Sequence, residues 1–236
     1  MAAIIVNLEC ITNMHVGNGD VNFNIIDNEV ERDPVTGYPT INASGVKGAL
    51  REYCEKRCEA SVVKEIFGDA GQAGKLRFLC ADIVAMPVRA SKGDAAYYLV
   101  SSETAIQQYN EKFRMFLDKD VICELSKENG LAAEGITLSQ SVNVFGKTVY
   151  ILKNAEFALL SLPVMARNKL ENGKSKNLWY EELVPHHSLF TFAVLAEDCD
   201  KELLNQFCVL IDGKLLQFGG DATIGYGICK ASVQGV

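Results

Sequence analysis

The chain has 236 residues, of which 48% are apolar and 22% charged, a composition that supports a folded core and excludes a disordered chain. No stretch approaches the roughly 20 apolar residues of a membrane span, and the N-terminus lacks the basic region of a secretory signal. A net charge of −7 argues against a nucleic-acid partner, but the total says nothing about where the charges lie.

The eight cysteines are scattered, mostly within apolar runs, and no C-x2-C pair is present. This usage predicts reduced thiols and a cytoplasmic protein. Cys54 and Cys58 are four residues apart and, with His186 and His187, are candidates for a zinc site. The alternative is that both thiols pack as small hydrophobic groups, and the spacing favours it.

In the first half of the chain, residues 3–12 alternate with a period of two and predict a strand. The long segment 13–43 is rich in Gly, Asn and Asp and is expected to be an ordered, functional loop. A helix is predicted to begin with Ser44 as its N-cap and to continue or restart up to Gly68. Strands are expected at 75–86 and 95–100.

In the second half, apolar spacing predicts a helix after Ser102. Residues 119–147 are polar and weakly patterned, which indicates a mobile insertion. Further strands are expected at 148–152, 157–165, 189–196 and 226–233. Apolar residues from Leu203 to Leu215 have helical spacing and predict a last helix, which the glycines 219–220 are expected to end. The irregular alternation favours an α+β fold, with helices on one face of a largely antiparallel sheet.

Two glycine-containing segments could form anion-binding turns. His15 opens the first, His-Val-Gly-Asn-Gly, which lacks the third glycine and the following helix of a dinucleotide-binding motif and equally fits a tight turn. The second, residues 219–227, holds four glycines between a helix and a strand, and it predicts either a backbone nest for an anion or a connector.

Four carboxylates lie close together in the long loop: Asp27, Glu29, Glu31 and Asp33. Such a run attracts a divalent cation or is solvated by mutual repulsion, and a solvated loop is the simpler reading. Asp27 differs from the others because it follows two isoleucines that can anchor its backbone.

The start of the helix after the loop combines free backbone amides with two cations. Lys47 and Arg51 lie one turn apart, and Gly45 and Gly48 remove side-chain bulk where a ligand backbone can approach. The pattern fits a phosphate site and an ordinary capped helix equally well.

Taken in order, these segments resemble the RAMP superfamily of CRISPR proteins. The resemblance is carried by His15-x-Gly-x-Gly, Ile26-Asp27, Thr36-Gly37-Tyr38-Pro39, the 44–51 segment Ser-Gly-Val-Lys-Gly-Ala-Leu-Arg, and the terminal glycine loop. Met86-Pro87-Val88-Arg89 and Trp179-Tyr180-Glu181-Glu182 are similar to one branch, the backbone subunit of the type III-B (Cmr) effector complex.

The resemblance implies a single RAMP domain over 1–236, with a modified ferredoxin-like (RRM-like) palm and a β-hairpin thumb near 164–178. It implies binding of guide CRISPR RNA, complementary target RNA, further copies of the chain in a filament and other Cmr subunits, with no membrane partner. It also implies endoribonuclease activity in antiviral defence, with Asp27 as catalytic residue and ligand of a divalent metal, Mg²⁺ or Mn²⁺. Asp27 either holds this metal or accepts the 2′-hydroxyl proton.

Motifs and resemblance together predict a set of RNA-binding residues: His15, Gly45, Lys47, Gly48, Arg51, Arg167, Lys169, Gly219, Gly220 and Gly225. The chain lacks the aromatic motifs of a true RRM, so binding is expected to use phosphate and backbone contacts.

The chain departs from the family pattern at two places. The family helix usually begins Pro-Gly-Ser-Ser, where this chain has Asn42-Ala43-Ser44-Gly45, and Ala222 stands where the family often has an acidic residue. The alternatives are a non-catalytic guide-RNA scaffold, a repeat-processing ribonuclease of another RAMP branch, and a small-molecule enzyme.

Overall fold

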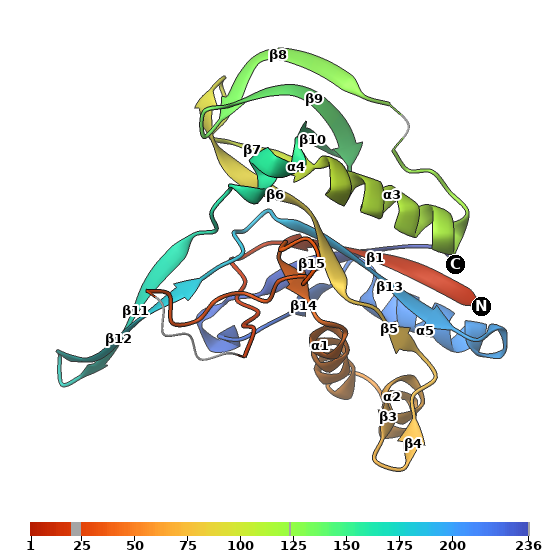
Figure 1. Ribbon diagram of the computed structural model, residues 1–236. Coiled ribbons are helices and arrows are strands. Elements are labelled where there is room, and N and C mark those ends of the chain that lie inside the picture. Colours follow the sequence, from red (N-terminus) through yellow and green to blue (C-terminus); the bar gives the residue numbers. More distant parts are fainter. Residues whose placement is uncertain (20–24, 123, 236) are drawn as a thin grey trace.

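A large sheet organises the fold, and the computed structural model describes residues 1–19, 25–122 and 124–235. Its eleven strands are β1 (Ala2–Cys10), β2 (Thr40–Ile41), β5 (Arg77–Phe78), β6 (Ala81–Lys92), β7 (Tyr97–Ser102), β8 (Ser126–Ala133), β9 (Ile136–Val144), β10 (Lys147–Leu152), β13 (Leu189–Ala196), β14 (Leu215–Gln217) and β15 (Ile228–Gln234). Their main order is β14-β15-β1-β13-β6-β7-β10-β9-β8, with β2 added to β6 and β5 to β13 (Figure 1). All neighbours are antiparallel except β7 and β10.

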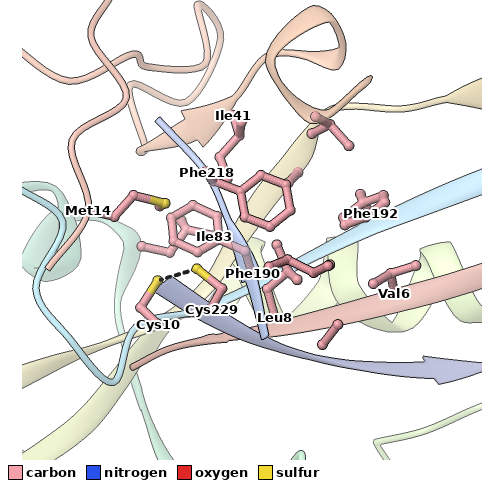
Figure 2. Packing of buried hydrophobic residues seen from close by; sticks show 14 of the residues in the cluster. Val6, Leu8, Cys10, Met14, Ile41, Ile83, Phe190, Phe192, Phe218 and Cys229 are labelled. Carbon is pink, nitrogen blue, oxygen red and sulfur yellow. Dashed lines mark hydrogen bonds between the residues drawn. The ribbon is translucent and has the colours of Figure 1, made fainter. Parts of the chain in front are cut away.

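The strand predicted at 3–12 is confirmed as β1, and it is buried on both faces. Ile4, Val6 and Leu8 point into one apolar cluster, whereas Ile5 points into a second cluster on the opposite face. Figure 2 shows the first cluster, where Cys10 of β1 lies beside Cys229 of β15. Because successive side chains of a strand alternate between faces, β1 has to be apolar on both.

Helices cover both faces of the sheet, which corrects the prediction that they cover one. The longer helices are α1 (Ala43–Glu55), α2 (Ala60–Phe67), α3 (Glu103–Leu117) and α5 (Lys201–Ile211), with a short α4 (Asn154–Ala158). Buried residues of α1, α2 and α5 belong to the cluster around Ile4, whereas Ile106, Tyr109 and Phe113 of α3 belong to the cluster around Ile5. In Figure 1, α3 lies on the opposite side of the sheet from α1 and α2. The chain contains both helices and strands in irregular order, as predicted. The sheet, however, has two apolar faces, and each needs helices to cover it.

The helix predicted after Ser102 is confirmed as α3, and its cap explains where it begins. Ser102 Oγ accepts a hydrogen bond from the Ala105 amide at 3.0 Å, which satisfies one of the free donors of the first turn. The predicted N-cap of α1 is wrong by two residues: Asn42 is the N-cap, without a side-chain hydrogen bond, and Ser44 lies in the first turn. The helix begins earlier because the extended strand β2 ends at Ile41.

In the second half of the chain, one predicted strand is wrong, and the last predicted helix is confirmed as α5 but ends earlier. Residues 157–165 were expected to form a strand, but they contain the end of α4 and a connection to the next strand. The last helix ends at Ile211 rather than Leu215, because Gly213 makes a turn with a φ of 68° and Leu215 pairs in β14. Short apolar runs fit a strand and a buried helix equally well, so periodicity alone does not distinguish them.

The segment predicted as a mobile insertion, 119–147, contains the hairpin of β8 and β9. These strands pair with each other and extend the sheet from β10 and β6. The structure therefore has strands in a segment whose sequence shows little periodicity. The periodicity is weak because much of this hairpin is exposed to solvent. Mobility of the segment stays a prediction.

A second hairpin, separate from the large sheet, is formed by β11 (Val164–Glu171) and β12 (Lys174–Glu182). Its two-residue turn is Asn172-Gly173, both with positive φ, the combination that tight hairpins favour. The hairpin projects from the body of the molecule, at the end away from both termini (Figure 1). It includes the predicted hairpin region 164–178 and continues to Glu182, beside the loop that holds Asp27.

Three smaller elements complete the description: the strand pair β3 (Gly68–Asp69) and β4 (Gln72–Ala73), and the 3₁₀ helices η1 (Asp198–Asp200) and η2 (Ala222–Ile224). None of the described helices is long and apolar enough to cross a membrane. In the described ranges, the cysteines are free thiols, and no three His, Cys, Asp or Glu side chains gather as a metal-binding group. Cys54 is buried in the apolar cluster under α1, as the packing interpretation of this thiol expects.

Candidate functional site

The loop that carries Asp27 is attached to the outer edge of strand β12. The backbone carbonyl of Tyr180 accepts hydrogen bonds from the amides of Asp27 and Asn28, at 3.1 and 3.2 Å. In the opposite direction, the Tyr180 amide donates to Asp27 Oδ2 at 2.8 Å, and the Glu182 amide donates to the Asn28 carbonyl at 2.9 Å. Asp27 is thus held at its backbone and at one carboxylate oxygen.

The Asp27 side chain is exposed, and Oδ1 has no hydrogen bond or ion pair within the described part of the chain. One carboxylate oxygen is therefore fixed and the other faces outward. This donor set fits Mg²⁺, which is commonly bound by one or two carboxylates together with water and substrate phosphates. It does not make a complete protein cage.

The rest of the acidic run is not gathered around Asp27. Asp33 Oδ1 accepts the amides of Val35 and Thr36, at 3.1 and 2.7 Å, and so forms a local turn. Arg32 Nη2 pairs with Glu182 Oε1 at 2.5 Å, which ties the same loop to the end of β12. Arg32, a residue of the loop itself, therefore compensates the charge of Glu182.

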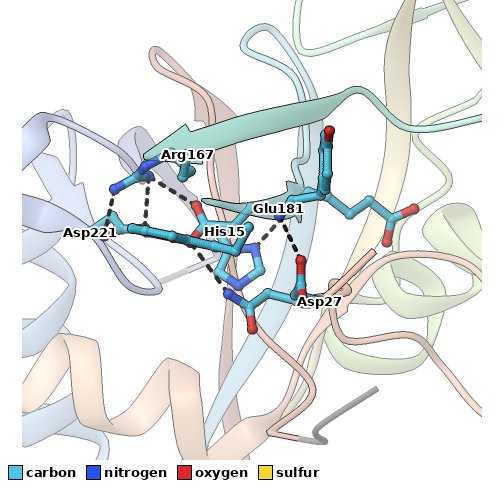
Figure 3. A network of polar contacts seen from close by, with 9 residues as sticks. His15, Asp27, Arg167, Glu181 and Asp221 are labelled. Atoms are coloured by element: carbon cyan, nitrogen blue, oxygen red, sulfur yellow. Dashed lines mark hydrogen bonds and ion pairs between the residues drawn. The ribbon is translucent and has the colours of Figure 1, made fainter. Parts of the chain in front are cut away.

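Arg167 lies at the centre of a polar network that joins three segments of the chain (Figure 3). Its Nη1 atom is 2.9 Å from Glu181 Oε2 on β12, and 3.2 Å from Asp221 Oδ2 in the glycine loop. Nη2 donates to Asp221 Oδ1 at 3.4 Å, and the guanidinium faces the rings of Trp179 and Tyr226.

The electrostatics of this network keep Arg167 charged. Burial works against the charge, but the hydrogen bond to Asp221 and the charges of Glu181 and Asp221 outweigh it and raise the pKa of Arg167. The side chain of Arg167 is 21% exposed, and its positive charge is matched by two carboxylates. Arg167 is therefore not a free cation on the hairpin surface.

His15 joins the same region from the other side. Its Nδ1 lies 2.8 Å from the Glu182 carbonyl, and its own carbonyl accepts the Gly220 amide at 2.9 Å. Gly219 has a φ of 78°, and a Cβ added there would lie 2.2 Å from the His15 carbonyl oxygen. The glycine loop therefore packs directly on His15, and only glycine at position 219 allows this approach. Gly225 also has a positive φ, of 86°, and follows η2.

The predicted residues on α1 form a separate group. Lys47 Nζ makes no ion pair or hydrogen bond among the described residues, whereas Arg51 pairs with Glu55 at 2.8 Å and donates to the Gly68 carbonyl. Gly45 and Gly48 are exposed. A Cβ at Gly48 would meet nothing within 4 Å, so the fold gives no packing reason for a glycine there.

Lys169 is a predicted residue that takes no part in the network. Its side chain is 66% exposed, and its one ion pair among the described residues is a 4.0 Å contact with Glu171. Lys169 and Arg167 lie on one face of β11, but only Arg167 reaches the glycine loop.

The structure thus joins Asp27, His15, Arg167 and the glycine loop around the end of β12, and leaves the α1 residues and Lys169 apart from them. The sequence pattern predicts no role for Glu181 or Asp221. Glu181 follows a cation-rich segment, but its pairing with Arg167 depends on the strand register that places Arg167 opposite Trp179, and the approach of Asp221 depends on how the glycine loop packs.

The chain is similar in sequence to two known proteins over nearly its whole length. The chain is 27% identical to the CRISPR system Cmr endoribonuclease Cmr4 of Pyrococcus furiosus, covering 100% of this chain and 97% of the relative. It is 25% identical to the CRISPR system CMR subunit Cmr4 of Saccharolobus solfataricus, covering 94% of each chain.

Solved structures show the same fold. A chain of the type III-B Cmr-beta complex bound to cognate target RNA matches with a TM-score of 0.80 at 21% identity, over 99% of this chain and 97% of that one. Oligomeric Cmr4 from P. furiosus matches with a TM-score of 0.72 at 24% identity, over 100% of this chain and 99% of that one. The model of the RAMP superfamily matches residues 7–230, and the chain belongs to this superfamily.

Proposed function

We propose that this chain is the backbone subunit of a type III-B CRISPR effector complex, which binds guide CRISPR RNA and cleaves complementary target RNA in antiviral defence. The observation that carries the proposal is the full-length match to a relative named as a Cmr endoribonuclease, which leaves no part of this chain uncovered. Its partners are guide RNA, target RNA, further copies of the chain and other Cmr subunits. A cytoplasmic location agrees with the free cysteines of the described residues.

The finer fold assignment is a ferredoxin-like palm with a thumb. It is supported by the antiparallel order β15-β1-β13-β6, with α1 and α2 between β1 and β6 in sequence and α5 between β13 and β15. The order supports a βαββαβ arrangement of the ferredoxin-like type, which we propose as the palm of one domain over 1–236. The β11–β12 hairpin is the candidate thumb, because it projects from the sheet with most of its side chains exposed.

Guide RNA is proposed to bind along the start of α1 and the glycine loop. Lys47 offers a cation that no described residue pairs, and Gly45 and Gly48 leave the helix surface without side chains, so that a phosphate backbone can approach. His15, Gly219, Gly220 and Gly225 shape the glycine loop, and Lys169 supplies charge on the hairpin. These contacts address phosphate and backbone, so binding should be largely independent of guide sequence.

Cleavage is proposed to use Asp27 and the target's own 2′-hydroxyl, whose oxygen attacks the adjacent phosphorus while the 5′-oxygen of the next nucleotide leaves, giving a 2′,3′-cyclic phosphate and a 5′-hydroxyl. The fixed Oδ2 sets the position of the carboxylate, and the outward Oδ1 is available to accept the hydroxyl proton or to hold a divalent ion. Mg²⁺ or Mn²⁺ bound there would neutralise charge on the scissile phosphate. The chain's own contribution is the placement of one carboxylate beside a protruding hairpin.

The experiment that tests this function is a reconstituted complex with guide RNA and 5′-labelled complementary target RNA, in Mg²⁺ or Mn²⁺ and in EDTA. Wild-type complex is expected to give evenly spaced products, which EDTA and Asp27→Ala abolish while target binding persists. Unchanged products from Asp27→Ala would remove Asp27 as the catalyst.

Two other outcomes point to different functions. If wild-type complex binds target without cutting it, the chain is a non-catalytic scaffold, a reading that the alanine at position 222 favours. If the free chain cleaves precursor guide RNA, it is a repeat-processing ribonuclease.

A further inference from the structure

We infer that Arg167 is a positioning residue that fixes the Asp27 loop to the hairpin and the glycine loop, and that it is not a phosphate ligand. The inference rests on the proposed function, because the reaction that it concerns is the cleavage assigned to Asp27.

The Arg167 guanidinium is already occupied by two carboxylates. It contacts Glu181 of the neighbouring strand β12 at 2.9 Å, and Asp221 of the glycine loop, 54 residues away in sequence, at 3.2 and 3.4 Å. A phosphate at this guanidinium would have to displace Asp221 or approach two negative charges. Lys169, 66% exposed on the same strand, is the better phosphate ligand.

Arg167 compensates the charge of the buried Glu181 carboxylate. The Glu181 side chain is 6% exposed and accepts three hydrogen bonds, from Arg167, from Trp179 Nε1 at 2.7 Å and from Asn28 Nδ2 at 3.4 Å. Arg167 is the one cation among these three donors. Its removal leaves a buried carboxylate without a compensating charge, which is strongly unfavourable, so Glu181 is expected to turn toward water.

Glu181 is connected to the Asp27 carboxylate through the neighbouring residue Asn28. Asn28 follows Asp27 directly, its side chain contacts Glu181, and its backbone forms a parallel bridge with the same residue. If Glu181 turns outward, Asn28 loses a partner and the loop loses part of its attachment to β12. A misplacement of about 1 Å can slow a reaction by roughly 100-fold, so cleavage is expected to be sensitive to this contact.

Asp221 extends the same contact to the glycine loop. It has a φ of 58°, a left-handed conformation that Asp and Asn both tolerate, and its carboxylate faces both Nη atoms of Arg167. The guanidinium therefore contacts the glycine loop directly through Asp221, and it contacts the loop that carries Asp27 indirectly, through Glu181 and Asn28 (Figure 3). A shift of the hairpin would be transmitted to both loops.

The first test uses the free chain without RNA, so its result does not depend on the proposed function. Hydrogen exchange of peptides covering 25–32 is compared between wild type, Arg167→Gln and Lys169→Gln, a matched control that removes one charge from the same face of β11. Faster exchange is expected in Arg167→Gln alone, since the amides of Asp27, Asn28 and Val30 all donate to β12 residues. Equal exchange in all three proteins would overturn the inference.

The second test uses the assembled complex with guide RNA and saturating target RNA. Arg167→Gln is expected to slow single-turnover cleavage by about 10- to 100-fold without changing the salt dependence of RNA binding. A phosphate ligand would behave in the opposite way: the slope of log K against log salt would fall by about 0.7, and bound target would be cut at the wild-type rate. That result overturns the inference.

Asp221→Asn provides an independent variant that keeps the Arg167–Glu181 pair and the backbone conformation of the loop. Positioning predicts slower cleavage, by less than in Arg167→Gln. If Arg167 were a phosphate ligand, loss of the Asp221 charge would free it, and RNA would bind more tightly with cleavage at least as fast. A wild-type complex that does not cut would contradict the proposed function, while the exchange test would still decide the role of Arg167.

Discussion

The Tyr180 backbone amide donates a hydrogen bond to Asp27 Oδ2 at 2.8 Å, across a sequence separation of 153 residues. The same residue's carbonyl accepts the Asp27 amide, so both polar groups of one hairpin residue hold the exposed carboxylate. The hairpin strand is therefore a support for the candidate catalytic residue as well as a projecting element.

This relationship predicts that Asp27→Asn and Asp27→Ala have different effects on structure and the same effect on cleavage. Asparagine keeps an oxygen that accepts the hydrogen bond of the Tyr180 amide, so the thermal unfolding midpoint of Asp27→Asn should match that of wild type. Alanine loses this hydrogen bond, which should lower the free energy of unfolding by about 1 kcal/mol. Both should reduce cleavage by at least about 100-fold, since neither can accept a proton or bind a metal as a carboxylate does. Cleavage by the asparagine variant at the wild-type rate would contradict the assignment.

Lys47 and Arg51 are predicted to differ as RNA ligands, although the sequence treats them alike. Lys47 has no partner in the described chain, whereas Arg51 is shared with Glu55 and the Gly68 carbonyl. Lys47→Gln should therefore lower the salt-dependence slope of guide binding by about 0.7, with no change in stability. Arg51→Gln should lower the slope less and reduce the thermal midpoint. Guide-RNA titrations at several salt concentrations measure the slope of log K against log salt for each variant. Equal slopes for wild type and Lys47→Gln would exclude a contact between Lys47 and an RNA phosphate.

Gly48→Ala should stabilise the free chain and weaken RNA binding. Alanine is favoured over glycine inside a helix by about 0.8–1 kcal/mol, and a Cβ at this position meets nothing within 4 Å. Gly45→Ala is the companion variant, with a smaller gain because its Cβ would lie 3.4 Å from Ile41. Denaturant unfolding and guide-RNA titration are measured on the same preparations. A more stable protein with unchanged RNA affinity would show that RNA does not lie against this surface.

Gly219→Ala should destabilise the chain, and Gly220→Ala should not. Position 219 combines a φ of 78° with a Cβ position 2.2 Å from the His15 carbonyl, whereas the nearest neighbour at position 220 is 4.0 Å away. The strained backbone alone costs about 1–3 kcal/mol, while the second change should stay within about 0.5 kcal/mol. Free energies of unfolding from denaturant titrations compare the two, and equal values would contradict the described packing of the loop on His15.

The stabilising contribution of Cys54 should disappear at alkaline pH. Burial first, and then the neighbouring Cys58, raise the pKa of the Cys54 thiol from its ordinary value of 9.0 to about 12. As pH rises, the unfolded chain therefore ionises first, so the contribution is complete below about pH 9 and is lost progressively toward pH 12. The stability difference between wild type and Cys54→Ala, followed from pH 7 to about pH 10.5, should shrink above about pH 9. A difference that is constant across this range would contradict the shift.

The sequence by itself determined the local elements whose pattern is strong. β1 and β13 are apolar runs between polar segments, α3 has an apolar stripe and a serine cap, and α1 has a consistent helical spacing. Local periodicity and capping depend on residues within a few positions of one another, so they are readable from the chain. The motifs around Asp27 and α1 likewise identified the RAMP superfamily, to which the chain belongs.

Only the tertiary structure decided what these residues contact. Arg167 and Lys47 are both cations in predicted RNA-binding segments, but Arg167 lies between two carboxylates and Lys47 has no partner among the described residues. Likewise, Asp27 is distinguished from the other acids of its loop by the backbone of Tyr180. These contacts join residues that are 14 to 153 positions apart, and they depend on strand register and on which loop packs beside the hairpin. Net charge and local spacing contain no information on register or loop packing, so a charge of −7 is compatible with a lysine that has no partner among the described residues.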